Sequence, residues 1–140
     1  MSAIKATVDQ LNALNPGTLC ENLGIEFIDV GETHVTARMP VDPRTIQPFG
    51  LLHGGASVAL AETLGSVASQ MVAGLDRTCV GVEINANHLK SIKQGFVYGT
   101  ARPLRLGKNM HVWNIEIIDD YENLICISRL TVLVKGKPSE

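Results

Sequence analysis

The sequence has few of the features by which secreted, metal-binding or nucleic-acid-binding proteins are recognised. Its three cysteines, Cys20, Cys79 and Cys126, are odd in number and show no CxxC or CxxH spacing, which argues against a disulfide framework and against a zinc site. Aromatic residues make up only 4% of the chain and the net charge is -2, so the chain offers neither stacking platforms nor a basic patch. We expect reduced thiols, a cytoplasmic location, no metal and no nucleic-acid partner.

The sequence also lacks a signal peptide and an uninterrupted apolar span. Residues 1–15 contain neither an apolar core nor a small-residue cleavage site. The apolar stretch after His53 is interrupted by Glu62, Gln70 and several serines and glycines, whereas a membrane span needs about 20 mostly apolar residues. We therefore interpret this stretch as a buried helix and expect no membrane partner.

The composition is that of a protein with a well-packed core. The chain has 140 residues, of which 45% are hydrophobic and 19% are charged. A chain of this length can bury a core without disulfide or metal crosslinks, which predicts a single domain over residues 1–140. The low charge also makes self-association plausible.

The first half of the chain predicts a helical cap, a hairpin and one long helix. Residues 9–14 form a short amphipathic pattern within an N-terminal cap of residues 1–22. Strands at residues 26–30 and 34–39 flank a turn at Gly31-Glu32. Residues 54–74 are apolar nearly all round, which indicates a helix that is covered on most sides.

The second half changes to a period of two residues. We predict four strands there, at residues 79–86, 96–102, 111–117 and 124–134. In the first of them Val80, Val82, Ile84 and Ala86 are expected to share one face. Short turns between strands favour antiparallel neighbours. The expected fold class is α+β, a curled antiparallel sheet of five to six strands around one central helix.

The segment QPFGLLHGGASVALAETLGS, residues 47–66, places chemical groups at the expected start of that helix. A helix that begins at Gly54 and Gly55 has free N–H groups and positive potential at its first turn, and glycine allows a carbonyl oxygen to approach them. This arrangement suits an oxyanion hole for acyl transfer. The alternative is that the two glycines only relieve crowding where loop meets helix.

Glu62 is the one charged residue in this apolar helix. Ser66 lies one turn further along the same face and is a candidate to assist the carboxylate. A carboxylate beside a dry cleft can act as a nucleophile or as a general base for water. Alternatively, Glu62 faces solvent or a subunit contact.

Gln47 and His53 flank the start of the helix. An amide can orient a carbonyl group, and an imidazole can donate a hydrogen bond or move a proton. Each residue alone could be structural, with His53 as a helix cap. The chain has no GxSxG, HExxH or GxxxxGK[ST] signature, so serine-hydrolase, zinc-protease and P-loop interpretations lack support.

Four segments together carry a family resemblance: PVDPRTIQPFGLLHGGASVALAETLGS, VGVEINANHLKS, LRLGKNMHVWNIEI and SRLTVLV. Over residues 23–134 the chain resembles the hotdog-fold acyl-CoA thioesterases of the 4-hydroxybenzoyl-CoA and phenylacetate-pathway type. The greatest likeness is to the bacterial branch that contains the enterobactin proofreading and dihydroxynaphthoyl-CoA thioesterases. The QPFGxxHGG block followed by a glutamate is the most specific of these motifs.

The resemblance implies a helix wrapped by a sheet and a thioester hydrolase that needs no cofactor. It also implies dimers joined edge to edge, with each site between two subunits, and a homotetramer made of two such dimers. The implied substrate is an aryl or medium-chain acyl thioester of coenzyme A or of an acyl-carrier protein, which is hydrolysed to free acid and thiol.

By position in the motifs, the resemblance assigns roles to individual residues. Glu62 would be the catalytic carboxylate, the Gly54 N–H would polarise the thioester carbonyl, and His88 would line the acyl pocket. Gln47 and His53 would assist, and Ser66 would help the hydrolytic step. The residues implied to bind coenzyme A are Gly81, His88, Leu89, Lys90, Ser91, Arg105, Leu106, Gly107 and Lys108.

Two other functions remain open to the sequence. A hotdog-fold dehydratase or hydratase would need a differently placed histidine with an acidic partner, a pattern missing here. A non-catalytic acyl-CoA sensor of the same fold is the alternative from a different class. Sensors of this fold carry a DNA-binding segment in front, and only about twenty non-basic residues precede the first strand here.

Overall fold

The protein is described by a computed structural model over residues 3–136. The predicted cap of residues 1–22 therefore lies within the described part, apart from its first two residues. The elements in chain order are α1 (Val8–Asn12), α2 (Leu19–Leu23), β1 (Glu26–Val30), β2 (Val35–Pro40), α3 (Gly54–Ala73), β3 (Thr78–His88), β4 (Phe96–Leu106), β5 (Met110–Asp119) and β6 (Leu124–Lys135).

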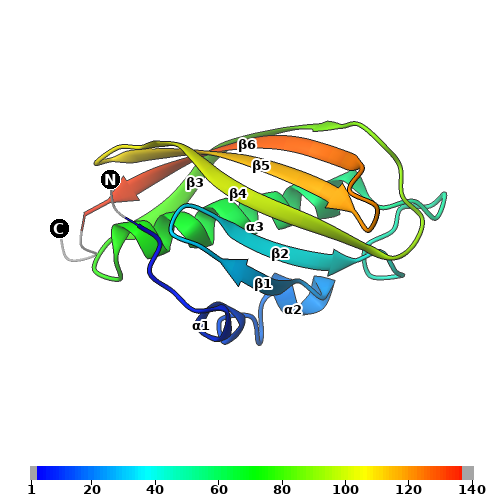
Figure 1. Ribbon diagram of the computed structural model, residues 1–140, viewed down its shortest axis with the longest axis horizontal. Coiled ribbons are helices and arrows are strands. Elements are labelled where there is room, and N and C mark those ends of the chain that lie inside the picture. Colours follow the sequence, from blue (N-terminus) through cyan, green and yellow to red (C-terminus); the bar gives the residue numbers. More distant parts are fainter. Residues whose placement is uncertain (1–2, 137–140) are drawn as a thin grey trace.

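Six strands form one antiparallel sheet that curls around α3 (Figure 1). The strand order is β1-β2-β4-β5-β6-β3, and every neighbouring pair is antiparallel. The short helix α1 packs against β1, and α2 contacts α3. The predicted α+β class, with one long helix and a curled antiparallel sheet, is confirmed.

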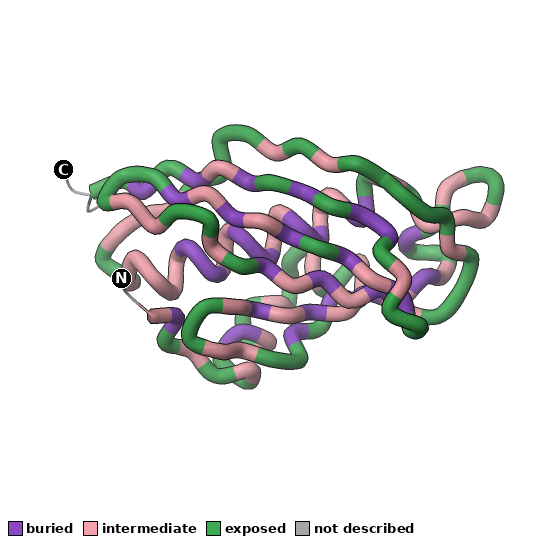
Figure 2. Tube along the Cα trace, turned by 45° about the horizontal axis from the view of Figure 1, so that its top comes forward, coloured by how far each residue is buried: buried purple, intermediate pink, exposed green. Residues whose placement is uncertain are grey.

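The long helix α3 occupies the concave side of the sheet. Leu60, Leu64 and Ala68 are fully buried along it, and no residue from 56 to 73 is exposed. The other positions from 56 to 73 are buried or half-buried, which agrees with the expectation of a helix covered on most sides. Figure 2 shows the buried positions recurring along this helix and alternating along the strands that face it.

Strand β3 forms one edge of the sheet and departs from the predicted pattern. Val80 and Val82 are 39% and 58% exposed, whereas Ile84 and Ala86 pack against the core. The expectation that these four residues share a face is therefore wrong. The pairing of β3 with β6 shifts between Gly81 and Glu83. Such a bulge adds one residue to the strand and reverses which positions face inward.

One further helix and two strand ends also differ from the sequence prediction. Helix α2 was not expected, since its five residues are too few to show a helical period. Strand β3 continues to His88, two residues beyond its predicted end. Strand β4 continues to Leu106, so Arg105 and Leu106 lie at a strand end, and the turn itself starts at Gly107.

A buried polar network joins α3 to β5. The Nε1–H of the fully buried Trp113 donates to Ser69 Oγ at 2.6 Å, and His111 Nδ1 lies 2.9 Å from the same oxygen. Burial is the main cause that lowers the pKa of His111 below its ordinary value of 6.5, and the charge of Arg77 lowers it further. The native protein therefore holds this imidazole neutral at pH 7.

The state of His111 predicts an acid-sensitive stability. The unfolded chain takes up a proton near pH 6.5, while the folded chain resists it to lower pH, so stability is lost as the pH falls below 6.5. We expect the urea midpoint to fall between pH 7 and pH 5.5 by more in the wild type than in His111→Gln, which cannot take the proton. If the urea midpoint falls equally in the two proteins, His111 does not contribute to the loss of stability in acid.

Candidate active site

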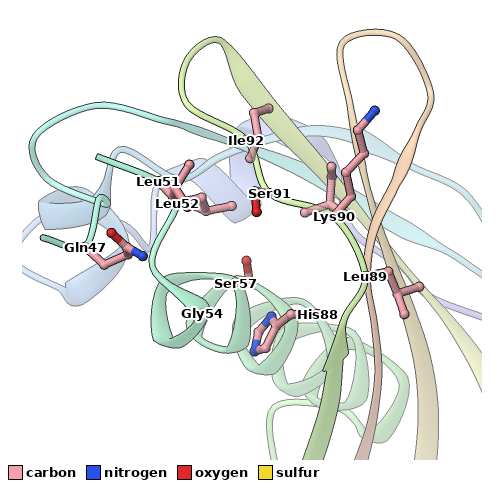
Figure 3. Close-up of a pocket in the computed structure, with 11 residues that line it drawn as sticks. Gln47, Leu51, Leu52, Gly54, Ser57, His88, Leu89, Lys90, Ser91 and Ile92 are labelled. Carbon is pink, nitrogen blue, oxygen red and sulfur yellow. The ribbon is translucent and has the colours of Figure 1, made fainter. Parts of the chain in front are cut away.

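A cavity of about 350 Å³ opens at the start of α3 (Figure 3). One wall is the loop before α3 and another is the segment that follows β3. A hydrogen bond from the Leu52 N–H to the Ile92 carbonyl, 2.8 Å, joins these walls, and the Leu89 N–H donates to the Ile125 carbonyl at 2.7 Å. The lining residues are Gln47, Leu51, Leu52, Gly54, Ser57, His88, Leu89, Lys90, Ser91, Ile92 and Ile125.

The first turn of α3 leaves one backbone donor free in this cavity. His53 caps the helix, because its Nδ1 accepts from the Gly55 N–H at 2.8 Å. The next two N–H groups, of Ala56 and Ser57, both donate to the His53 carbonyl. Among the described residues the Gly54 N–H has no hydrogen-bond partner, and Gly54 lines the cavity. A free N–H at a helix N-terminus is a donor suited to a carbonyl oxygen that gains negative charge.

Gly54 also has to be small because of His88. A Cβ added at position 54 would lie 2.9 Å from His88 Nε2. His88 is the last residue of β3, and Figure 3 shows its ring beside the first turn of α3. The imidazole and the free N–H therefore border the same space.

Gln47 belongs to the same cavity, on the loop side. Its side-chain oxygen accepts a hydrogen bond from the Phe49 N–H. This contact fixes the amide and leaves its NH₂ group available to a ligand.

The structure does not bring His53 to this cavity. Its side chain is the helix cap described above and lines a separate depression with Leu19, Leu23 and Ala59. By accepting this hydrogen bond, the His53 ring stabilises the first turn of α3, which is a structural role.

Glu62 and Ser66 lie further along α3 and do not line the cavity. Eight residues separate Gly54 from Glu62, which corresponds to about 12 Å of helix. The half-buried Glu62 carboxylate lies against the edge strand, since a Cβ added at Gly81 would be 2.7 Å from Glu62 Oε2. Gly81 therefore makes room for the carboxylate on β3. Ser66 is half-buried.

The residues expected to meet phosphates form a third group. Arg105, Leu106, Gly107 and Lys108 lie around the turn between β4 and β5, and Figure 1 shows this turn at the opposite end of the molecule from the start of α3. Two further cavities border the turn, one of them lined by Arg77 and Lys108. Apart from His53, the predicted site residues of one chain thus fall into three separate groups.

The cavity lining includes residues that the sequence did not identify as site residues, among them Leu52, Ser57, Ile92 and Ile125. The signal for Ser57 was its spacing, because a residue three positions after Gly54 lies on the same helix face. The two isoleucines carry no such signal, since their sequence pattern is that of ordinary core residues.

The thiols do not add further chemistry to the site, and the acidic groups do not form a metal site in the described part of the chain. Burial raises the pKa of the Cys79 and Cys126 thiols, which keeps them protonated at neutral pH. Over residues 3–136 no three His, Cys, Asp or Glu side chains are grouped so as to hold a metal ion. None of the helices in this range is long and apolar enough to cross a membrane.

Comparisons with known proteins agree with this fold and its long helix. Residues 49–126, more than half of the chain, match the thioesterase superfamily. The chain is 49% identical to the 1,4-dihydroxy-2-naphthoyl-CoA hydrolase of Escherichia coli strain K12 over 130 residues, which cover 93% of this chain and 96% of that protein. It is also 49% identical to the proofreading thioesterase EntH of Cronobacter turicensis, with 93% and 95% covered.

A solved structure gives the same result. The thioesterase HI1161 from Haemophilus influenzae superposes with a TM-score of 0.93 at 47% identity, over 97% of this chain and 96% of that chain. The expected enzyme class is thereby confirmed. The chain belongs to the thioesterase superfamily and is a hotdog-fold thioester hydrolase.

Proposed function

We propose that the protein hydrolyses an acyl thioester of coenzyme A, with an aryl or medium-chain acyl group, or the matching thioester of a carrier protein. The observation that carries this proposal is the free Gly54 N–H in a cavity bordered by His88 and Gln47. The name of the Escherichia coli relative specifies an aryl-CoA substrate, which supports an aryl acyl group.

In this proposal the thioester carbonyl oxygen accepts a hydrogen bond from the Gly54 N–H. The NH₂ of Gln47 orients the thioester, His88 lines the acyl side, and His53 contributes by holding the first turn of α3. The positive end of the helix stabilises the oxyanion as the carbonyl carbon becomes tetrahedral.

Glu62 supplies the carboxylate for the attack, either as the nucleophile or as the base that removes a proton from water. In the second case a carbon–oxygen bond forms to water, the carbon–sulfur bond breaks, and the thiolate takes up a proton. In this proposal Ser66, one turn away on α3, binds that water. In the first case Glu62 bonds to the carbonyl carbon, the thiolate leaves and takes up a proton, and water then hydrolyses the anhydride that has formed. Both routes therefore consume one water and release a free acid and a thiol.

The separation of the three residue groups favours a site that two copies of the chain build together. Glu62 faces the edge strand β3, whose outer side has no partner strand within the described chain. A two-fold axis beside β3 relates two copies that lie side by side in opposite directions, so that opposite ends of the two chains are neighbours. It brings the β4–β5 turn of one copy toward the start of α3 in the other, and Glu62 of one copy closer to Gly54 of the other.

The coenzyme A arm then runs along residues 88–91 and past Gly81 toward positive charge. Lys90, Arg105 and Lys108 are exposed and can meet its phosphates. Leu89 and Ser91 border the arm, and Leu106 and Gly107 shape the turn that presents the charges. A tetramer of two such dimers and a cytoplasmic location stay predictions.

The Gly54 donor can be tested by comparing two substitutions at one position. Gly54→Ala keeps the N–H and adds a Cβ, whereas Gly54→Pro adds the ring and removes the N–H. Proline is well tolerated at the first position of a helix, and His53 has the extended backbone that precedes proline. We expect kcat for an aryl-CoA to be about 10²-fold lower in Gly54→Pro than in Gly54→Ala.

Circular dichroism and thermal melting serve as the control that both variants keep α3. If the two variants hydrolyse the thioester at equal rates, the Gly54 N–H does not stabilise the oxyanion and the proposed site is wrong.

A further inference from the structure

Ser57 presents a hydroxyl group that the fold itself does not use. The residue is only 1% exposed, and its Oγ makes no hydrogen bond to any other described residue. No fully buried side-chain oxygen or nitrogen in the described chain lacks a partner, so this hydroxyl must be reached from the cavity. Figure 3 shows it pointing from α3 into the cavity, toward the hydroxyl of Ser91 on the opposite wall. Buried hydroxyls are nearly always hydrogen-bonded, which points to a ligand.

The surroundings of Ser57 define the chemistry of that ligand. Leu51, Leu52, Ile92 and Ile125 give the cavity aliphatic walls, and the hydroxyls interrupt them. Leu89 and Lys90 also line the cavity, but Figure 3 shows their side chains directed away from Ser57. A neutral chain in which amide groups alternate with methylenes matches such a lining, because its methylenes meet the walls and its amides meet the hydroxyls.

The spacing along α3 identifies which part of the chain lies there. Ser57 follows Gly54 by three residues, about 4.5 Å along the helix axis, and lies on the same face. In a pantetheine thioester two methylenes separate the sulfur from the first amide, a similar length. With the thioester carbonyl at the Gly54 N–H, this amide lies beside Ser57.

We propose that Ser57 is a specificity-determining residue that hydrogen-bonds the cysteamine amide of the pantetheine arm. The inference rests on the proposed function, because the thioester must lie at Gly54. Ser57 selects thioesters that carry this amide over simple alkyl thioesters with the same acyl group. It binds the arm that carries the leaving thiol and does not contact the acyl chain.

The test compares two thioesters with one aryl acyl group. The first is the N-acetylcysteamine thioester, which contains the amide, and the second is the ethanethiol thioester, which lacks it. For Ser57→Ala we expect the loss in kcat/KM to be about 5- to 10-fold greater on the first than on the second, the effect of one hydrogen bond. Ser128→Ala, a buried serine outside the cavity, is the matched control and should not change this ratio.

Equal losses on both thioesters, or no loss on either, would overturn the role of Ser57. Ser57→Cys, which keeps the side-chain size and weakens the hydrogen bond, should shift the ratio in the same direction if Ser57→Ala folds poorly.

Calorimetric titration with pantetheine separates this inference from the proposed function. If the wild type hydrolyses no thioester, the proposed function fails. Weaker pantetheine binding by Ser57→Ala would still support the amide contact, and equal binding would refute it. If the wild type hydrolyses both thioesters and the variant leaves their ratio unchanged, the inference alone fails.

Discussion

Glu62→Gln is expected to lower kcat for thioester hydrolysis by about 10³-fold, while KM and the melting temperature change little. Glutamine keeps the size of the side chain beside Gly81, so the packing of α3 on β3 persists. It can neither attack the carbonyl carbon nor take a proton from water, so only the polarisation by the Gly54 N–H remains. Steady-state release of thiol, followed with a disulfide reagent, measures the effect.

Glu116→Gln is the matched control for this experiment. Glu116 is an exposed glutamate on β5, and its replacement should leave kcat within twofold of the wild type, as most surface changes do. A kcat for Glu62→Gln within tenfold of the wild type would make Glu62 a structural acid. Loss of the fold in this variant would lead to the same conclusion.

Two inactive variants are expected to restore activity when their subunits are exchanged. In a mixture of Glu62→Gln and Gly54→Pro chains, one class of shared site receives an intact Gly54 from the first chain and an intact Glu62 from the second. Random pairing at a one-to-one ratio makes about a quarter of the sites intact. We expect about a quarter of wild-type activity, about 250-fold above the Glu62→Gln parent and about 25-fold above the Gly54→Pro parent.

The exchange experiment includes its own control. Chains that both carry Glu62→Gln should stay inactive after the same unfolding and refolding. If the mixed sample is no more active than its parents, although the chains demonstrably co-assemble, Glu62 and Gly54 of one chain serve the same site. Glu62 would then have to reach the cavity within its own subunit.

The central helix was predictable because its signals are local. The apolar run after Gly54, the capping position of His53 and the stop at Gly74 all lie within the segment that they specify. Strands β5 and β6 were also predictable, because each is buried on one face and its apolar residues therefore alternate with polar ones. The antiparallel pairing and the wrapping of the sheet followed from short turns and from one helix that needed cover. The strand order, in which β3 pairs with β6 and β4 with β2, was not predicted.

The failures concern features that tertiary contacts decide. The bulge after Gly81 exists where β3 passes the Glu62 carboxylate, so no local alternation could reveal that Val82 faces outward. Helix α2 is held by its contact with α3 and by the turn at Gly24. Neither the bulge nor helix α2 produces a periodic pattern of apolar residues in the sequence.

The candidate site was predictable in its residue types but not in its grouping. Gly54, Gln47 and His88 lie around one cavity, because the helix start and the end of β3 are neighbours. Glu62 and the turn at Lys108 lie elsewhere in the chain. Sequence distance along α3 cannot tell whether a second copy closes this gap. Ser57 was missed because its one signal, the spacing of three residues from Gly54, does not distinguish a ligand-binding serine from an ordinary helix residue.

The most direct test of the central claim is thiol release by the wild-type protein from a panel of aryl and fatty acyl-CoA thioesters. The proposed function predicts turnover with kcat/KM above about 10⁴ M⁻¹s⁻¹ for at least one aryl-CoA, within the usual range for enzymes. Absence of turnover across the whole panel and on carrier-protein thioesters, in a folded protein that binds coenzyme A, would contradict it and indicate a ligand-binding protein.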